Sequence, residues 1–303
     1  PRFFFKQKTA YELGVRLVGS EMCIREQSSL SNNIEKKIQD KISTELSKKQ
    51  RKGTLDDGFK KNKVVNEVLD KTTVLILYDL IKSKIISYVN GVVKSGKESA
   101  LFWAVGPDES NLALKIYLTS TSNFKNRSQY LIGDPRFQRI KKGTKNLVYL
   151  WARKEFQNIS KCYDCGINVV KPIHISKNVL VMEFVGHNGK PQKNLLESEV
   201  NEDDYHQSLK IISDLFHKAK LVHADFSEYN IFKTENGLKL FDLGSAVDLE
   251  HPQAIDLLKR DINNISNFFV KRGLTVENPV DVFERLSLIH ISEPTRRTPI
   301  SYA

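Results

Sequence analysis

The sequence predicts an α+β fold with two lobes. The N-terminal lobe contains an antiparallel β-sheet and one helix, and the C-terminal lobe is smaller and mostly helical. Two observations support this prediction. Three short β-forming segments follow one another between residues 88 and 117, with turn residues between them. After residue 200, an amphipathic helical pattern leads into a short hairpin pattern. We assign the lobes to residues 71–185 and 186–285.

Both ends of the chain resemble translated read-through of sequencing-library adapters. We therefore leave residues 1–26 and 286–303 out of the predicted fold. Residues 1–26 contain acidic residues and no continuous apolar core, which argues against a signal peptide. The two ends carry seven Lys or Arg and four Asp or Glu, so residues 27–285 have a formal net charge of +8, compared with +11 for the whole chain. This basic core is long enough for one sizeable or two modest domains.

The composition of the core predicts a soluble, cytoplasmic protein with no membrane contact. No segment reaches the roughly 18 consecutive apolar residues that a membrane helix needs. Cys162 and Cys165 form one CxxC pair, which is half of a structural zinc site. Two reduced thiols in a cytoplasmic loop are the simpler interpretation.

Residues 27–70 are predicted to form a basic arm that contains a helix. Apolar residues recur every four positions within residues 31–48, as expected of an amphipathic helix. Between residues 35 and 63 there are ten Lys or Arg and five Asp or Glu. This excess of positive charge suits contact with RNA, and a solvated helix face explains it equally well.

The pattern of the N-terminal lobe predicts a helix, three strands, a second helix and a buried strand. The first helix covers residues 74–86. The three strands cover residues 88–93, 100–105 and 112–117, with turns at Ser95-Gly96 and at residues 106–108. The second helix covers residues 147–159, and the buried strand covers residues 179–185.

The C-terminal lobe is predicted to begin with a helix over residues 204–219. Two short strands, at residues 229–233 and 238–242, then flank the sequence Glu235-Asn236-Gly237. Asn-Gly readily adopts the positive φ angles of a tight turn, so these strands are expected to form a hairpin.

Polar residues on either side of this hairpin predict ATP-dependent phosphoryl transfer. The sequence His223-Ala-Asp225 is followed by Asn230, and Asp242 comes twelve residues later in an Asp-x-Gly motif. Phosphoryl transfer needs a carboxylate at the attacking hydroxyl, and an amide and a second carboxylate on Mg²⁺. We expect Asp225 to orient the hydroxyl and accept its proton, and Asn230 and Asp242 to bind Mg²⁺, with Mn²⁺ as an alternative. His223 is expected to brace the loop.

The N-terminal lobe is expected to supply the residues that bind ATP. Lys115 lies on an alternating strand from which it can reach the phosphates, and Glu155 on the second helix can hold it in place. Taken alone, such residues are more often an edge-strand lysine and an exposed helical acid. Their order along the chain, however, matches the parts of a protein-kinase-like fold. The predicted ATP-binding residues are Ser95, Gly96, Lys97, Leu101, Lys115, Glu155, Met182, Glu183 and Val185.

With these motifs the chain resembles the RIO family of atypical serine/threonine protein kinases, in particular its first subfamily and the archaeal kind. The resemblance runs from about residue 70 to residue 285. The residues that carry it are Ser95–Glu98, Ala113–Tyr117, Gly133–Phe137, Trp151–Glu155, Val181–Phe184, Leu221–Asp225, Asp242–Ala246, His251-Pro252 and Lys259–Asp261.

The resemblance also explains departures from ordinary protein kinases. Ala224 stands where most have arginine, Ser227 stands where most have lysine, and no Ala-Pro-Glu segment follows Asp242. The resemblance implies serine/threonine kinase activity, and ATP turnover in the maturation of the small ribosomal subunit through a phosphoaspartate at Asp242. The implied partners are the precursor rRNA of that subunit and its proteins.

Residues 121–146 fit the flexible basic loop of this subfamily. Between residues 124 and 145, seven Lys or Arg accompany one Asp and the aromatic residues Phe124, Tyr130 and Phe137. Basic residues interleaved with aromatic ones suit contact with rRNA, and a solvated loop explains them equally well. The basic residues chosen to test this contact are Arg136, Arg139, Lys141 and Lys142, and Ser128 is a candidate autophosphorylation site.

Two other functions fit parts of the pattern. A small-molecule kinase of the aminoglycoside or choline type also has HxDxxxxN and a later aspartate, but only about forty residues follow Asp242 before the excluded end. An inactive scaffold that binds precursor rRNA is the second alternative. The presence of Lys115, Asp225, Asn230 and Asp242 argues against it.

Overall fold

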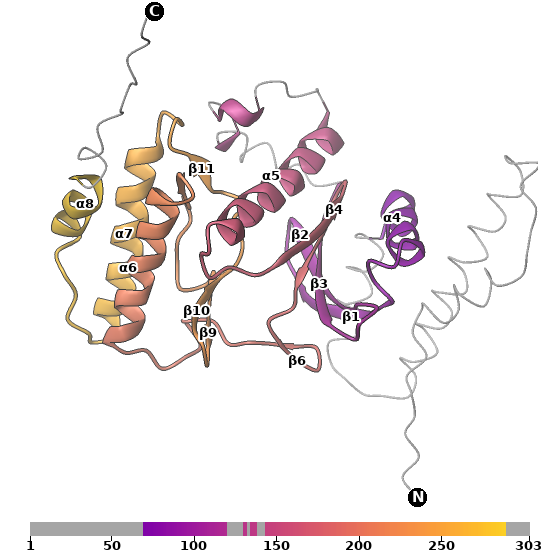
Figure 1. Ribbon diagram of the computed structural model, residues 1–303, viewed down its shortest axis with the longest axis horizontal. Helices are drawn as coiled ribbons and strands as arrows, with labels where there is room; N and C mark the ends of the chain where they lie inside the picture. The colour runs from indigo at the N-terminus through magenta and orange to yellow at the C-terminus, as the bar shows by residue number, and fades with distance from the viewer. Residues whose placement is uncertain (1–68, 120–129, 132–133, 138–142, 289–303) are drawn as a thin grey trace, which may run out of the picture. The chain divides into compact units, whose positions relative to one another are not determined.

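The computed structural model describes residues 69–119, 130–131, 134–137 and 143–288 (Figure 1). Residues 27–68 of the predicted arm, most of the predicted loop at 121–146 and Ser128 lie outside the described residues. The chain divides into two compact units, residues 1–118 and residues 119–303. The predicted lobe boundary at residue 185 stays a prediction.

Within the described residues, helix α4 (Lys71–Lys82) is the first element of the first unit. The side chain of Asp70 caps this helix by accepting a hydrogen bond from the backbone N–H of Thr73 at 2.7 Å. The helix therefore begins three residues before the predicted start, and it ends at Lys82 rather than at Ile86. Ile76 and Leu80 are buried.

Three antiparallel strands follow, as the sequence predicts: β1 (Tyr88–Ser95), β2 (Ser99–Val105) and β3 (Asn111–Tyr117). The side chains of β2 alternate in burial, and Ala100, Phe102 and Ala104 are buried. The register places Leu101 of β2 opposite Lys115 of β3.

In the second unit, the short 3-10 helix η3 (Pro135–Phe137) comes before the long helix α5 (Thr144–Asp164), which extends the predicted helix at both ends. It leads to the antiparallel pair β4 (Pro172–Ser176) and β5 (Val179–Glu183), and then to the short pair β6 (Gly186–His187) and β7 (Lys190–Pro191). Residues 179–182 of β5 are all buried, as expected of a strand inside a core. The sequence did not predict β4, β6 or β7.

Helix α6 (Glu202–His217) then leads to the segment that contains His223 and Asp225, and it begins two residues before the predicted start. Its start is fixed by a capping box in which Asn201 and Asp204 bond to each other's backbone N–H groups. Strands β8 (Leu221–Val222) and β11 (Val247–Asp248) pair with each other, and β9 (Ile231–Thr234) pairs with β10 (Gly237–Leu240).

The β9–β10 hairpin is present, but its turn differs from the prediction. Thr234 pairs with Gly237, so Glu235 and Asn236 form the loop. Of Glu235, Asn236 and Gly237, only Gly237 has a positive φ, +99°. The glycine is thus needed at the first position of the returning strand and not at the tip of the turn.

Two further helices, α7 (Ala254–Lys271) and α8 (Pro279–Leu288), complete the second unit. In Figure 1, α7 lies alongside α6, and α8 lies at the outer side of this pair. Helices α7 and α8 were not predicted from the sequence. Leu286 is 5% exposed and belongs to α8, so the helix extends three residues into the segment that resembles an adapter.

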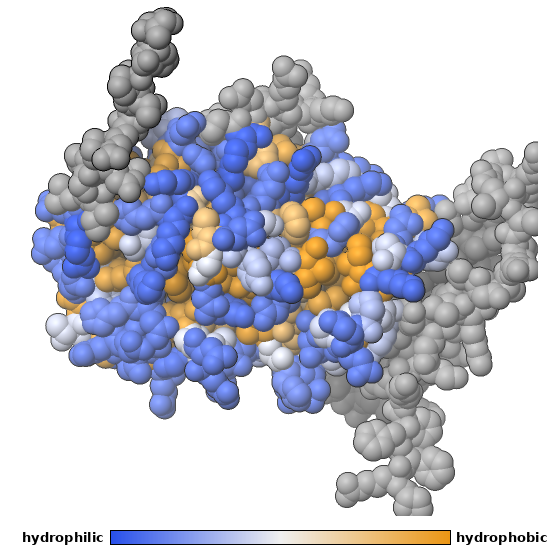
Figure 2. Space-filling model, in the orientation of Figure 1, coloured by the Kyte–Doolittle hydropathy of each residue, from blue (hydrophilic) through white to orange (hydrophobic). Residues whose placement is uncertain are grey.

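Hydrophilic residues dominate the visible surface of the part that contains α6 and α8, with apolar residues between them (Figure 2). This distribution is typical of amphipathic helices that pack one face against a core. Within the described ranges, no helix is long and apolar enough to span a membrane.

Candidate active site

The segment from His223 to Asn230 directly follows strand β8. Hydrogen bonds to α7 hold the backbone of this segment. The buried carboxylate of Asp261 on α7 accepts hydrogen bonds from the backbone N–H groups of Ala224, at 2.7 Å, and Phe226, at 3.1 Å. The guanidinium of Arg260 donates to the carbonyl of Ala224. Ala224 has a φ of +64°, which is costly for a residue with a Cβ. These bonds hold the backbone on both sides of Asp225.

Asp225 itself is exposed, whereas its neighbours Ala224 and Phe226 are buried. An exposed carboxylate on a fixed backbone suits the predicted role, because a substrate hydroxyl has to reach it from solvent. Burial raises the pKa of Asp261 to about 7, although the two N–H groups and Arg260 oppose this change. The Asp225 carboxylate also raises it.

One hydrogen bond links Asn230 to Asp225, and another links Asn230 to the residue before Asp242. The side-chain Nδ2 of Asn230 donates to the carbonyl of Asp225 at 3.0 Å. The backbone N–H of Phe241 donates to the carbonyl of Asn230, also at 3.0 Å. The structure therefore brings together Asp225, Asn230 and Asp242, the three residues that the sequence predicted for the proton acceptor and the metal site.

The donor set at this place fits Mg²⁺. Because Nδ2 of Asn230 is used by Asp225, the amide oxygen is the atom left to face a cation. Asp242 is half-buried, and one of its carboxylate oxygens accepts from the N–H of Gly244 at 3.4 Å. Carboxylate and amide oxygens are hard ligands of the kind that Mg²⁺ uses with substrate phosphates. Among the residues described, no group of three or more His, Cys, Asp or Glu side chains could hold a metal alone.

His223 packs as a brace, as predicted. It is buried, and its ring meets the ring of Phe226 edge to face, with 5.5 Å between the ring centres. Neither ring nitrogen makes a hydrogen bond within the described part of the chain. Burial lowers the pKa of His223 to about 4, although the Asp242 carboxylate opposes this effect. The side chain is therefore neutral at physiological pH.

Helix α5 packs against the segment that follows Asp242. A Cβ on Gly244 would lie 2.9 Å from the indole nitrogen of Trp151 and 3.3 Å from the carboxylate of Glu155. Both side chains are buried. Glycine is thus the residue that allows the Asp-x-Gly motif to approach α5, and it places Glu155 beside this motif.

The other predicted phosphate-binding residues belong to the first unit. Lys115 is half-buried on β3, with its ammonium 5.4 Å from the ring centre of Tyr117. Ser95, Gly96 and Lys97 are exposed at the turn between β1 and β2. The N–H of Gly96 donates to the carbonyl of Ser99 at 2.9 Å, which closes the turn. Their role toward ATP stays a prediction.

The predicted adenine-binding residues lie at and just after the end of β5. Met182 is buried, and the carbonyl of Val185 accepts from the N–H of Gln192 at 2.9 Å. The Glu183 carboxylate pairs with Lys239 of β10 at 2.9 Å. This ion pair joins β5 to the hairpin that lies between Asn230 and Asp242, a connection that the sequence did not predict.

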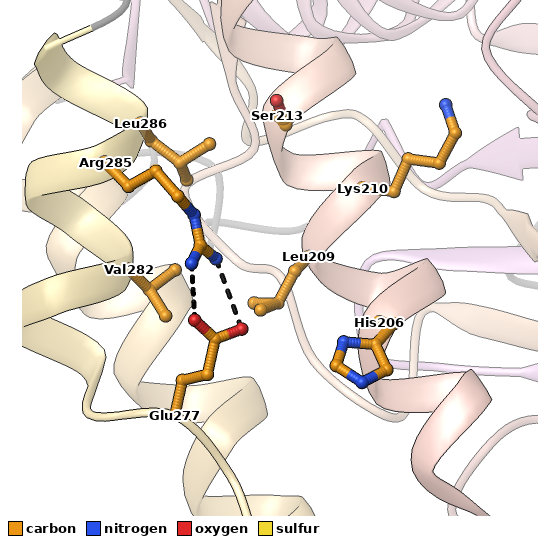
Figure 3. Close-up of a pocket in the computed structure, with 8 residues that line it drawn as sticks. All are labelled: His206, Leu209, Lys210, Ser213, Glu277, Val282, Arg285 and Leu286. Carbon is orange, nitrogen blue, oxygen red and sulfur yellow. Dashed lines mark hydrogen bonds and ion pairs between the residues drawn. The ribbon is translucent and has the colours of Figure 1, made fainter.

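Two other features do not belong to this site. A hollow of about 240 Å³ lies between α6 and α8, where Arg285 makes two hydrogen bonds to Glu277 (Figure 3). None of the predicted site residues lines it. Cys162 is buried and Cys165 is partly exposed, and both are free thiols. Burial raises the pKa of Cys162 to about 12, so this thiol stays protonated at physiological pH.

No role was predicted from the sequence for Lys154, Asn158 or Asp261. Each is a polar side chain on the buried face of a helix. Lys154 and Asn158 lie on the same helical stripe as Trp151, at intervals of three and four residues. The signal in the sequence that could have identified them is a polar residue within an otherwise apolar helical stripe.

Arg136 is placed differently from its expected role in RNA contact. Its guanidinium bonds to the buried Asp134 at 2.6 Å and to Asn158 Oδ1 at 2.8 Å. Burial alone would raise the pKa of Asp134, but the hydrogen bonds and charge of Arg136 outweigh it and lower that pKa. Arg136 therefore bonds within the protein. Arg139, Lys141 and Lys142 lie outside the described residues.

Comparison with known proteins then decides the family. A sequence model of the RIO domain matches residues 100–282. The chain belongs to the RIO family. Serine/threonine-protein kinase rio1 of Dictyostelium discoideum is 33% identical over 272 residues, which cover 88% of this chain and 46% of that protein. RIO-type serine/threonine-protein kinase Rio1 of Haloferax volcanii is 38% identical over 212 residues, which cover 70% of this chain and 73% of that protein.

The fold is also that of a RIO kinase. The structure of the Rio2 kinase from Chaetomium thermophilum, in its ADP/Mg²⁺-phosphoaspartate complex, matches with a TM-score of 0.53 at 23% identity. The match covers 69% of this chain and 65% of that one. It confirms the predicted α+β, protein-kinase-like fold. This RIO-family chain spans less than half the length of the Dictyostelium protein and of human RIO1, at 46% and 45%.

Proposed function

We propose that this chain is a Mg²⁺-dependent phosphotransferase that transfers the γ-phosphate of ATP to a serine or threonine hydroxyl. The observation that carries the proposal is the linked arrangement of Asp225, Asn230 and Asp242 in one unit. The names of the relatives, which are serine/threonine-protein kinases, support the same reaction. Membership of the RIO family favours it over a small-molecule kinase.

In this proposal Asp225 orients the attacking hydroxyl and accepts its proton. Asn230 and Asp242 hold Mg²⁺, which neutralises negative charge on the phosphate oxygens when it is bound. Lys115 binds the phosphates, Glu155 holds Lys115, and the turn at residues 95–97 approaches the triphosphate. Met182, Glu183, Val185 and Leu101 border the adenine. Most of the catalysis then comes from positioning and charge neutralisation.

We also propose that ATP is hydrolysed through Asp242. A carboxylate oxygen of Asp242 attacks the γ-phosphorus, the bond to the leaving oxygen of ADP breaks, and water then releases inorganic phosphate from the resulting acyl phosphate. The support is the phosphoaspartate named for the Rio2 structure from Chaetomium thermophilum. Such turnover would suit a role in small-subunit maturation, with precursor rRNA bound by the basic loop at 121–146, and a cytoplasmic location.

The experiment is incubation of the protein with ATP labelled at the γ-phosphate, with Mg²⁺ and then with EDTA. We expect label on the protein and release of labelled phosphate, both only with Mg²⁺. Asp242→Asn should abolish both, whereas Asp164→Asn, which changes an exposed carboxylate at the end of α5, should not. A parent protein that leaves ATP intact would support the RNA-binding scaffold instead. If an amino alcohol is added to the incubation, transfer of label to it would support the small-molecule kinase.

A further inference from the structure

Helix α5 holds the segment after Asp242 through two buried polar side chains. Lys154 is 0% exposed, and its ammonium donates to the carbonyls of Gly244, at 2.9 Å, and Ala246. Nδ2 of Asn158 donates to the carbonyls of Leu243 and Ala246, each at 2.9 Å. Three carbonyls of the segment that begins at Asp242 are thus bound from one helix.

Burial of the Lys154 ammonium needs a strong reason. Moving a cation out of water costs several kcal/mol, even after relaxation of the protein. Two carbonyl dipoles and the indole face of Trp151, with its centre 5.2 Å from Nζ, offset part of this cost. The two carbonyls belong to the backbone next to the proposed metal ligand, so the charge of Lys154 acts on the shape of that backbone.

The backbone at Asp242 has a conformation that needs such support. Asp242 has a φ of +58°, in the left-handed region. A non-glycine residue held there costs on the order of 1–3 kcal/mol, and it persists only where its surroundings fix it. The bonds from Lys154 and Asn158 to residues 243–246 are surroundings of this kind. Without them we expect the backbone at Asp242 to relax and its carboxylate to turn.

Asn158 also extends this network to another part of the chain. Its Oδ1 accepts from Arg136, which in turn pairs with the buried Asp134. Because Oδ1 is held by a donor, the orientation of the amide is fixed, and Nδ2 must point to the two carbonyls. Arg136 therefore contributes to the position of the segment after Asp242 through Asn158.

We propose that Lys154 and Asn158 are positioning residues that hold Asp242 in the backbone conformation needed to bind the metal. This inference rests on the proposed role of Asp242 in Mg²⁺ binding. It assigns to α5 a function in addition to that of Glu155.

The test compares Lys154→Met with Arg153→Met, which removes the same charge from an exposed position on the same helix. The first measurement is hydrogen–deuterium exchange of residues 241–247 without any ligand. Lys154→Met should speed this exchange at least about 10-fold and leave residues 172–183 at the parental rate, because only the first segment loses its bonds. Arg153→Met should match the parent throughout.

The second measurement is calorimetric binding of ADP with Mn²⁺ and then with EDTA. Lys154→Met should lower the affinity gained from Mn²⁺ at least about 10-fold and leave binding in EDTA unchanged. A folded Lys154→Met protein with parental exchange and a parental gain from Mn²⁺ would overturn the proposal. If this variant does not fold, Asn158→Ala decides by the same two criteria. A parent that gains nothing from Mn²⁺ would contradict the proposed function, and the exchange comparison would still decide the positioning role.

Discussion

The side-chain amide of Asn230 donates a hydrogen bond of 3.0 Å to the carbonyl of Asp225. This bond ties the proposed metal ligand to the proposed proton acceptor. It also fixes which end of the amide faces a cation, because the nitrogen is already used. The positions of the proposed metal ligand and of the proposed proton acceptor therefore depend on each other.

Replacing Asn230 should weaken the use of Mg²⁺. We expect Asn230→Ala to raise the Mg²⁺ concentration that gives half-maximal ATP turnover at least about 10-fold, since it removes a ligand oxygen and the bond to Asp225. Asn236→Ala, in the exposed turn of the β9–β10 hairpin, is the matched control and should behave as the parent does. An unchanged Mg²⁺ requirement in Asn230→Ala would remove this residue from the metal site.

The close approach of Gly244 to α5 predicts a second effect. Gly244→Ala should lower the free energy of unfolding by about 1–3 kcal/mol, because the new Cβ would meet Trp151 at 2.9 Å. It should also weaken metal-dependent ADP binding. Gly91→Ala is the control, since a Cβ there meets nothing within 4 Å. Urea denaturation measures the stability of both variants. Equal stabilities for the two variants would refute this packing.

Asp261 predicts a dependence of stability on pH. Burial raises its pKa in the folded protein from the ordinary value of 3.8 to about 7. Between pH 4 and 7 the folded protein keeps a proton that the unfolded chain has released. This side chain therefore lowers the free energy of unfolding as the pH rises through that interval, by about 1.4 kcal/mol for each pH unit between the two pKa values.

Asp261→Asn removes this titration and leaves that of His223 in place. The parent should therefore lose stability relative to the variant as the pH rises from 4 to 7, in urea denaturation at several pH values. The variant should also be less stable below pH 4 by about 1–3 kcal/mol, because one of the two N–H groups loses its acceptor. A difference that does not change with pH would show that the Asp261 carboxyl is ionised throughout.

Much of this fold was readable from the sequence, because local patterns determine it. The alternation along β2 and the turn residues at 95–96 and 106–108 predicted the three strands to within two residues. The HxDxxxxN spacing placed Asp225 and Asn230 together. The ends of α4 and α5 were less predictable, since α4 depends on a cap at Asp70 and α5 has no side-chain cap.

The remaining site residues depend on contacts that are distant in sequence. Lys154 bonds to carbonyls 90 and 92 residues away, and Asp261 bonds to N–H groups 35 and 37 residues away. A buried lysine and an exposed lysine look alike in a helical pattern. Only the position of the partner backbone tells them apart, and no local pattern contains that information.

The basic loop predicts binding of rRNA that weakens with salt. Neutralising Arg139, Lys141 and Lys142 to Gln should lower the affinity and reduce the slope of log affinity against log salt by up to about 0.7–0.9 for each lost phosphate contact. Arg136→Gln should instead lower stability, since its guanidinium bonds to Asp134 and Asn158. Filter binding and thermal unfolding separate the two effects. An unchanged salt slope in the triple variant would exclude contact through these residues.

The most direct test of the central claim is calorimetric binding of ATP to the parent and to Asp242→Asn, each with Mg²⁺ and with EDTA. We expect Mg²⁺ to strengthen ATP binding to the parent at least about 10-fold and to strengthen binding to Asp242→Asn far less, while the two proteins bind metal-free ATP equally. Equal strengthening by Mg²⁺ in both proteins, or no binding of ATP to the parent, would contradict this claim.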